Sequence, residues 1–134
     1  MPSAGGASPL TNRVLDYERA MKHLVPTVRS PSDWSPLAVF VDVENFERVG
    51  TFLEQQNWAQ YTQMLTQWAT SIDSFETTVR RISELAPLVY FEIEERHRRG
   101  GAVNVVNSLT VFEFDEHARI RHLAVYLQQR TATA

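Results

Sequence analysis

Between Phe91 and Gly101 the chain reads FEIEERHRRGG, a segment crowded with acidic and basic side chains. Carboxylates can accept protons, guanidinium groups can stabilise negative charge that develops on oxygen, and histidine exchanges protons near neutral pH. If one face of this segment lines a cavity, its residues could catalyse proton transfer on a bound molecule. If both faces meet water, they form an ordinary solvated surface. The elements around the segment decide between these two interpretations.

Three amphipathic helices are expected in the first half of the chain. The first can be capped by Thr11 and carries a buried stripe at helical spacing, made of Leu10, Val14, Tyr17, Met21 and Leu24. A short second helix is expected from Ser32 or Asp33 to about Asp42. The third follows Asn57, a good N-cap, and its aromatic face consists of Trp58, Tyr61, Leu65 and Trp68. Such stripes are typical of core packing.

From residue 72 onward the chain is rich in β-branched and aromatic residues, which favours strands. Turn-forming breaks near residues 84–87, 100–101 and 115–118 divide this part into four strands. The intervals between them are too short for crossover helices, so antiparallel hairpins are expected. A shorter strand over residues 45–52 would join the same sheet. The sequence therefore predicts an α+β fold with helices on one side of a bent sheet.

Composition excludes several classes of function. The chain has 134 residues and a net charge of −3, and its basic residues are spread along it, so no nucleic-acid partner is expected. The absence of cysteine excludes disulfides, thiolate metal sites and a cysteine nucleophile. There is no apolar run of about eighteen residues, so no membrane span is expected. We expect a cytoplasmic protein.

Three segments resemble the nuclear-transport-factor-2-like superfamily, which includes SnoaL-like polyketide cyclases, ketosteroid isomerases and limonene-epoxide hydrolases. They are DWSPLAVFVDVENFERVG, FETTVRRISELAPLVYFEIEERHRR and SLTVFEFDEHARIRHLAVYLQ. The resemblance implies a cone-shaped α+β barrel, with three N-terminal helices packed on a strongly curved, mixed but largely antiparallel sheet. It also implies a flexible N-terminus over residues 1–10 and a single SnoaL-like domain over residues 11–130.

In this superfamily the concave face of the sheet encloses a pocket, and alternation along each strand decides which side chains reach it. When this sequence is aligned with the epoxide-hydrolase pattern, the resemblance implies that the even-numbered residues of 92–98 point into the pocket. The expected cavity residues are then Asn45, Glu47, Glu92, Glu94, Arg96, Arg98, Ser108, Thr110, Phe112, Phe114, Leu123, Val125 and Leu127. The convex face would carry Phe91, Ile93, Glu95, His97, His122, Ala124, Tyr126 and Gln128.

The catalytic sets of the best-known relatives do not carry over. Arg96 matches the arginine of the epoxide hydrolases, but Arg98 stands where their first aspartate is expected and Val125 where the second is expected. Thr110 replaces the acidic oxyanion-hole residue of the ketosteroid isomerases, whose site is one of the best-described examples of pKa tuning.

The expected chemistry is acid/base catalysis on an apolar or polyketide-like substrate, as an isomerase, cyclase, dehydratase or hydrolase. Glu47 would take a proton and Arg96 would stabilise an oxyanion, with Glu47 or Glu94 pairing the guanidinium. Asn45 and Thr110 would orient the substrate. The rest of the predicted substrate-binding set is Ser108, Phe112, Leu123, Val125 and Leu127.

A second interpretation is a module of the same fold that binds a small ligand, or pairs with another copy, without catalysis. No cofactor and no metal site are expected, because no cluster of histidines and carboxylates falls on the expected inward face. The only macromolecular partner expected is a second copy of the chain, bound through the convex face of the sheet as a homodimer.

Overall fold

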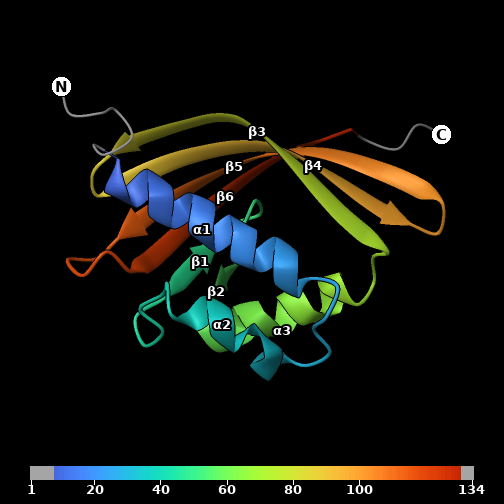
Figure 1. Ribbon diagram of the computed structural model, residues 1–134, viewed down its shortest axis with the longest axis horizontal. Coiled ribbons are helices and arrows are strands. Elements are labelled where there is room, and N and C mark those ends of the chain that lie inside the picture. The colour runs from blue at the N-terminus through green and yellow to red at the C-terminus, as the bar shows by residue number, and fades with distance from the viewer. Residues whose placement is uncertain (1–7, 131–134) are drawn as a thin grey trace.

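The computed structural model describes residues 8–130. Six strands form one mixed sheet in the order β2-β1-β6-β5-β4-β3. Figure 1 shows the helices α1, α2 and α3 gathered on one side of this sheet, which curves over them. The predicted α+β cone is thereby confirmed. No helix within the described part of the chain is long and apolar enough to cross a membrane.

The helices begin and end close to the predicted positions. Helix α1 spans Pro9–Leu24, α3 spans Trp58–Ala69, and the short second helix divides into a 3-10 turn, Pro31–Trp34, and one α-turn, α2, Ser35–Ala38. The second helix is therefore shorter than predicted. Residues 1–7 of the predicted flexible terminus lie outside the described residues, whereas residues 9 and 10 already belong to α1.

Capping explains the start of α3, and a proline explains the start of α1. Asn57 caps α3 as predicted, because its side chain accepts a hydrogen bond from the Gln60 backbone while the Gln60 side chain returns one to the Asn57 backbone. Thr11 is not a cap, since proline at the first helical position already starts α1 at Pro9. The backbone N–H and hydroxyl of Thr11 instead donate to Glu84 Oε1, at 2.8 and 2.9 Å, and so fix α1 to strand β3.

Four long strands run as consecutive antiparallel hairpins, broken where the sequence predicted. They are β3, Ser74–Leu85, β4, Leu88–Arg99, β5, Ala102–Phe114, and β6, Ile120–Gln129. The expected short strand is β1, Glu47–Val49, which pairs parallel with β6 and antiparallel with β2, Gln55–Gln56. Strand β2 was not predicted, because two residues leave no readable alternation.

A bulge interrupts β3 between Val79 and Arg81, where the pairing with β4 shifts by one residue. Before the bulge the odd-numbered residues face the helices, as Thr77 does when its hydroxyl donates to Glu18 of α1. After it the even-numbered residues do so, as Glu84 shows by accepting from Thr11. The bulge thus keeps both ends of a long, bent strand in register with the core.

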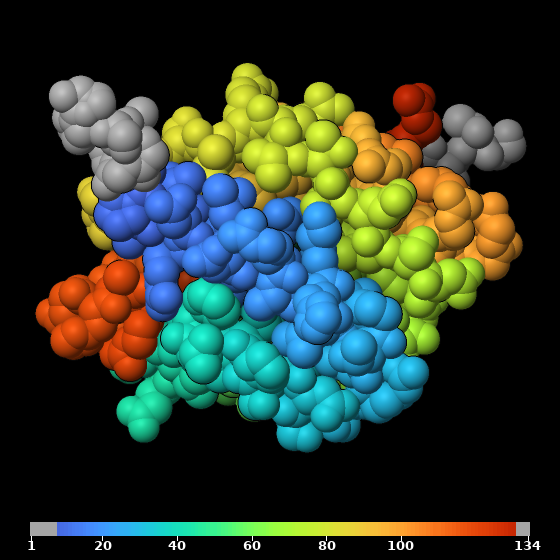
Figure 2. All heavy atoms as spheres, viewed as in Figure 1, coloured from blue at the N-terminus to red at the C-terminus, as the bar shows by residue number. Residues whose placement is uncertain are grey.

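The core lies between the inner face of the sheet and the helices. Its fully buried side chains are Val14, Val28, Trp34, Leu37, Val89, Ile120 and Leu123. The indole N–H of Trp34 donates to Thr66 Oγ1 at 3.0 Å, which links the 3-10 turn to α3. In Figure 2, α1 in blue lies against the cyan segment that contains α2, and together they cover the sheet from this side. Helices α1 and α3 and the inner face of the sheet form the walls of a cavity.

Candidate active site

A cavity of about 280 Å³ lies between the inner face of the sheet and helices α1 and α3. Its walls are mainly apolar and aromatic, built from Met21, Met64, Leu65, Trp68, Phe75, Phe91, Ile93, Phe112, Leu123, Val125 and Leu127. A concave apolar pocket with a few polar groups is the usual form of a small-molecule site. The polar side chains that reach it therefore decide what chemistry it can support.

Six of the residues expected in the cavity do line it. Ser108, Thr110 and Phe112 come from β5, and Leu123, Val125 and Leu127 come from β6. The alternation deduced for these two strands was correct, because their inward positions are the ones that bury apolar side chains. That these residues bind a substrate stays a prediction.

Strand β4 faces the opposite way from the prediction. Glu94 and Arg96 lie on the outer face, where Glu94 bonds to Arg80 and Arg96, and Arg96 also bonds to Thr78. The Arg96 side chain is 33% exposed. A catalytic role for Arg96 in the cavity is therefore wrong, as is substrate binding by Glu94. Glu92 likewise faces outward and pairs with Arg81.

The apolar residues of β4 explain this orientation. Val89, Phe91 and Ile93 are buried, and each contributes roughly 1.5–3 kcal/mol when removed from water. Turning the even-numbered residues inward would instead have desolvated several charges, at a cost of several kcal/mol for each ion. Phe91, Ile93, Glu95 and His97, which were predicted on the convex face, therefore line the cavity.

Strand β1 is also turned by one residue relative to the prediction. Glu47 lies outside the cavity, 46% exposed, with its Oε1 3.3 Å from His122 Nε2. Asn45 precedes the strand and donates to Asp42. Phe46 and Arg48 are the buried residues, because Phe46 packs against the aromatic rings of α3. The proposed base Glu47 and orienting residue Asn45 are therefore both corrected.

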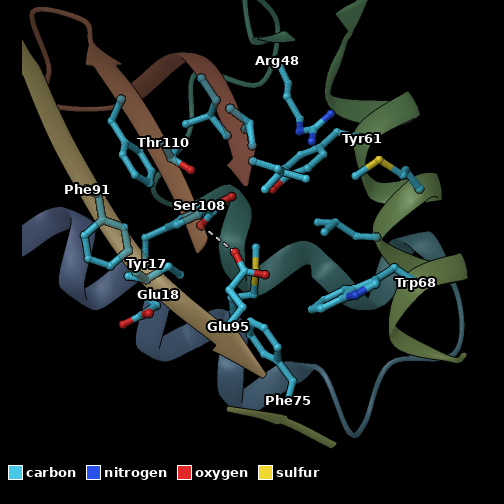
Figure 3. Close-up of a pocket in the computed structure, with 18 of the residues that line it drawn as sticks. Tyr17, Glu18, Arg48, Tyr61, Trp68, Phe75, Phe91, Glu95, Ser108 and Thr110 are labelled. Atoms are coloured by element: carbon cyan, nitrogen blue, oxygen red, sulfur yellow. Dashed lines mark hydrogen bonds between the residues drawn. The ribbon is translucent and has the colours of Figure 1, made fainter. Parts of the chain in front are cut away.

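Glu95 is the carboxylate held at the centre of the cavity wall. Its Oε2 accepts a hydrogen bond of 2.7 Å from Ser108 Oγ, drawn as a dashed line in Figure 3, and its Oε1 lies 2.8 Å from His97 Nε2. Each carboxylate oxygen can accept two hydrogen bonds. One acceptor position on each oxygen therefore remains for a bound molecule.

The surroundings of His97 define its protonation. The indole N–H of Trp68 points at His97 Nδ1 from 3.4 Å, so Nδ1 is the acceptor and the ring proton lies on Nε2. A neutral imidazole of this tautomer donates to Glu95 Oε1. Trp68 and Phe75 pack edge-on against the imidazole and fix its plane. Glu95 is therefore bonded to Ser108 and His97, and among residues 8–130 no arginine pairs with it.

A second carboxylate, Glu18 of α1, borders the cavity. It accepts a hydrogen bond of 2.9 Å from the hydroxyl of Thr77. In Figure 3 its carboxylate turns away from the group of side chains around Glu95. Glu18 is therefore less well placed than Glu95 to reach a molecule in the cavity.

Arg48 brings a positive charge to the cavity wall. It is only 8% exposed, its Nη1 donates to Gln56 Oε1 at 2.9 Å, and Glu54 Oε2 lies 3.7 Å away. The guanidinium sits over the ring of Tyr61, 5.5 Å from its centroid, as a cation–π contact. Figure 3 shows Arg48 and Tyr61 side by side at the edge of the cavity.

Tyr17 of α1 contributes a buried hydroxyl to the same cavity. The residue is 4% exposed, and its hydroxyl has no hydrogen-bond partner among the described residues. Burial, and then the neighbouring Tyr61, raise the pKa of Tyr17 well above its ordinary value. Burial also raises the pKa of Tyr61, against the lowering effect of Arg48. Both phenols therefore stay protonated and remain hydrogen-bond donors.

The cavity thus combines the carboxylates of Glu95 and Glu18, a histidine, a guanidinium and two phenols within apolar walls. A carboxylate can remove a proton from a bound molecule, and donors can stabilise the negative charge that results. Within residues 8–130 no three histidine or acidic side chains converge as metal ligands would.

Comparison with solved structures gives clear matches of fold. An NTF2-like protein from Anabaena variabilis shares 12% identity over 90% of each chain, with a TM-score of 0.73. A protein classed as a SnoaL-like polyketide cyclase, from Shewanella denitrificans, shares 12% identity over 89% of this chain and 90% of that chain, with a TM-score of 0.71. An LEH-like epoxide hydrolase of M. tuberculosis shares 14% identity over 87% and 84%, with a TM-score of 0.65.

The chain therefore has the nuclear-transport-factor-2-like fold, as the resemblance in the sequence predicted. Its structural matches include both SnoaL-like and LEH-like proteins. No protein-family profile matches the sequence, and no curated protein matches it either. At these identities the matches define the fold, and the chemistry has to be argued from the cavity.

Proposed function

We propose that this protein is an enzyme that transfers a proton on an apolar, ring-bearing small molecule, with Glu95 as the general base. The observation that carries the proposal is that the Glu95 carboxylate faces an apolar cavity, where it accepts from Ser108 and contacts His97, and that no arginine pairs with it among residues 8–130. A carboxylate paired with arginine, such as Glu94 on the outer face, is stabilised as the anion and becomes a weaker base.

The apolar walls support the same proposal. Aromatic side chains surround the site on several sides, from Trp68 and Phe75 to Phe91 and Phe112. They suit flat, ring-bearing molecules and exclude water, which strengthens electrostatic interactions with a developing charge. The polyketide-cyclase and epoxide-hydrolase names of two matched structures fit small-molecule chemistry of this kind.

Elimination on 5-nitrobenzisoxazole provides a test that needs no knowledge of the natural substrate. A base removes the proton from carbon 3, the C–H electron pair completes a nitrile, and the N–O bond breaks to leave a coloured phenolate. The molecule is small, aromatic and apolar, so it suits the cavity. Wild-type protein should accelerate this reaction above the rate in buffer, and Glu95→Gln should lower the rate at least about a hundredfold.

Glu94→Gln is the matched control, because it makes the same change one residue away on the outer face of β4. It should leave the rate unchanged. Glu18→Gln tests the other carboxylate of the cavity and should have only a small effect. A loss of merely a few-fold in Glu95→Gln would remove Glu95 from the role of base. Tight binding of the probe without any acceleration would instead favour the non-catalytic ligand carrier.

A homodimer through the outer face of the sheet is a separate proposal. Exposed apolar side chains on that face support it, namely Tyr90, Val103, Val105 and Tyr126. Sedimentation equilibrium of the wild-type chain tests it, and a doubled mass that falls to the monomer mass in Val105→Glu is expected. A monomer at all concentrations would contradict it.

A further inference from the structure

We propose that His97 is the end wall of the cavity and limits the length of the molecule that the cavity accepts. The substrate is then a compact ring-bearing molecule without a long chain at this end. This inference rests on the proposed function, because it names the size class of the substrate on which Glu95 acts.

The inner face of the sheet continues beyond the cavity. A second hollow of about 230 Å³ lies on the β4–β5 hairpin, where its lining residues are His97, Arg99, Ala102, Val103 and Asn104. His97 pairs with Asn104 across the two strands, and Arg99 pairs with Ala102, so these residues extend the row that begins inside the cavity. Because His97 also lines the cavity, its side chain separates the two spaces.

Several contacts fix the imidazole of His97 in this position. Its Nδ1 accepts from the indole N–H of Trp68 at 3.4 Å, and its Nε2 lies 2.8 Å from Glu95 Oε1. The rings of Trp68 and Phe75 pack edge-on against it, with centroids 5.6 and 5.3 Å away. The side chain is 16% exposed. A ligand that displaced the imidazole would break all of these contacts at once, so the wall stays closed.

Hydrogen bonds also fasten the backbone around this wall. Arg99 donates from Nε to the Ser71 carbonyl at 2.8 Å and from Nη2 to the Ser71 hydroxyl at 2.9 Å. The carboxylate of Asp73 accepts from the Gly100 N–H at 2.8 Å. These bonds join the connection between α3 and β3 to the tip of the β4–β5 hairpin. A longer ligand therefore cannot gain room by moving the two apart without losing them.

The wall matters for the substrate because Glu95 lies beside it. Glu95 and His97 are two residues apart on the same face of β4, so a molecule that brings a C–H group to Glu95 also lies near the imidazole. In Figure 3, Phe75 lies on the side of Glu95 away from Phe91. Phe75 pairs with His97 across β3 and β4, which places the wall on that side. A chain that points from Glu95 toward the hairpin is therefore excluded.

Binding of two ethers that differ only in chain length tests the wall without requiring catalysis. 2-Methoxynaphthalene and 2-butoxynaphthalene share their rings, and the additional methylene groups of the butoxy compound would ordinarily strengthen binding. Titration followed by naphthalene fluorescence should show that wild-type protein binds the methoxy compound about tenfold more tightly, because overfilling a closed site forces it to distort. Equal or tighter binding of the butoxy compound would overturn the proposal, and this outcome needs no variant.

His97→Ala should join the cavity to the hollow beyond it, so that the butoxy compound binds at least as tightly as the methoxy compound. Adding Asn104→Trp, which fills the outer hollow from an exposed position, should restore the preference for the methoxy compound. Adding Asn107→Trp instead, on the opposite face of β5, should leave the gain of His97→Ala intact. A gain that persists with Asn104→Trp would overturn the proposal, because the chain would then occupy another space.

The base and the wall can fail separately. If Glu95→Gln leaves the elimination rate unchanged but wild-type protein prefers the methoxy ether, the proposed base is wrong and the wall stands. If elimination depends on Glu95 but the two ethers bind equally, only the wall is wrong.

Discussion

The two faces of strand β4 carry the same kinds of charged residue but give them different partners. On the outer face, Glu94 is bound by Arg80 and Arg96, and the bond from Arg80 is the main cause that lowers its pKa. On the inner face, the donors that reach the neighbouring Glu95 from the described part of the chain are Ser108 and His97. One carboxylate is stabilised as an anion in a network of ion pairs, and the other remains available to react.

This difference teaches that the face of the sheet, rather than the residue type, decides which charged residues can carry out chemistry. The outer pairs are partly solvated, so each contributes little to stability. The inner polar groups are few and lie within an apolar cavity, where each unpaired donor or acceptor has a large effect.

Placing a charge on the inner face should be far more damaging than placing it on the outer face. Ile93→Glu would bury a carboxylate without a partner, and we expect it to lower the free energy of unfolding by roughly 3–5 kcal/mol. Ser83→Glu, at an exposed outward position of β3, should change it by no more than about 0.5 kcal/mol. Urea denaturation of both variants provides the measurement. Similar losses in the two would show that the faces are not distinct.

Removing one donor to Glu95 should affect catalysis rather than binding. Ser108→Ala should lower kcat for 5-nitrobenzisoxazole about tenfold and change KM less than twofold, because the Ser108 hydroxyl is bonded to the Glu95 carboxylate and holds it in position. Ser108→Thr keeps a hydroxyl and should restore most of the rate. Asn107→Ala, at the neighbouring outward position of β5, should change neither parameter. An effect confined to KM would contradict the positioning role.

Deleting the unpaired hydroxyl of Tyr17 should stabilise the folded protein. Tyr17→Phe removes a buried hydroxyl that makes no hydrogen bond of normal length among the described residues, so we expect the free energy of unfolding to rise by about 1 kcal/mol. Tyr90→Phe should leave stability unchanged, because its hydroxyl meets water in both states. A loss of stability in Tyr17→Phe would indicate that the hydroxyl has a structural partner after all.

The outer ion pairs should stabilise the fold at neutral pH and lose this effect in acid. The bond from Arg81 lowers the pKa of Glu92 below its ordinary value of 4.5, so the folded state binds fewer protons than the unfolded state in this range. The stabilisation is present above about pH 4.5 and is lost as the pH falls through the lower pKa of the folded state. Glu92→Gln and Arg81→Gln should both make the pH dependence of stability shallower below pH 4.5. An unchanged slope in either would rule out the pair as its source.

Much of the fold could be predicted because its signals are local. The breaks at residues 84–87, 100–101 and 115–118 mark real hairpins, and Asn57 caps α3 through contacts with a residue three positions away. The inward positions of β5 and β6 could also be predicted, because large apolar residues alternate there. These features depend only on neighbouring residues along the chain.

The residues at the centre of the candidate site, Glu95 and His97, were predicted on the wrong face of the sheet. The orientation of β4 was predicted from the position of an arginine in related enzymes. The alternation of the apolar residues Val89, Phe91 and Ile93 would have placed Glu95 and His97 inward. On β1 three residues give too little alternation to read. The unpaired hydroxyl of Tyr17 and the contact of Trp68 with His97 arise only when distant elements pack together.

Because of the bulge in β3, the attachment of helix α1 to the sheet depends on a single residue of that strand. One additional residue at Arg80 moves the inward positions from odd to even, so that Ile82 and Glu84 still point at helix α1. Deleting that single residue would rotate the second half of the strand by half a turn. Ile82 would then meet water, Thr11 would lose its anchor, and the helix that carries Tyr17 would come free at its N-terminal end.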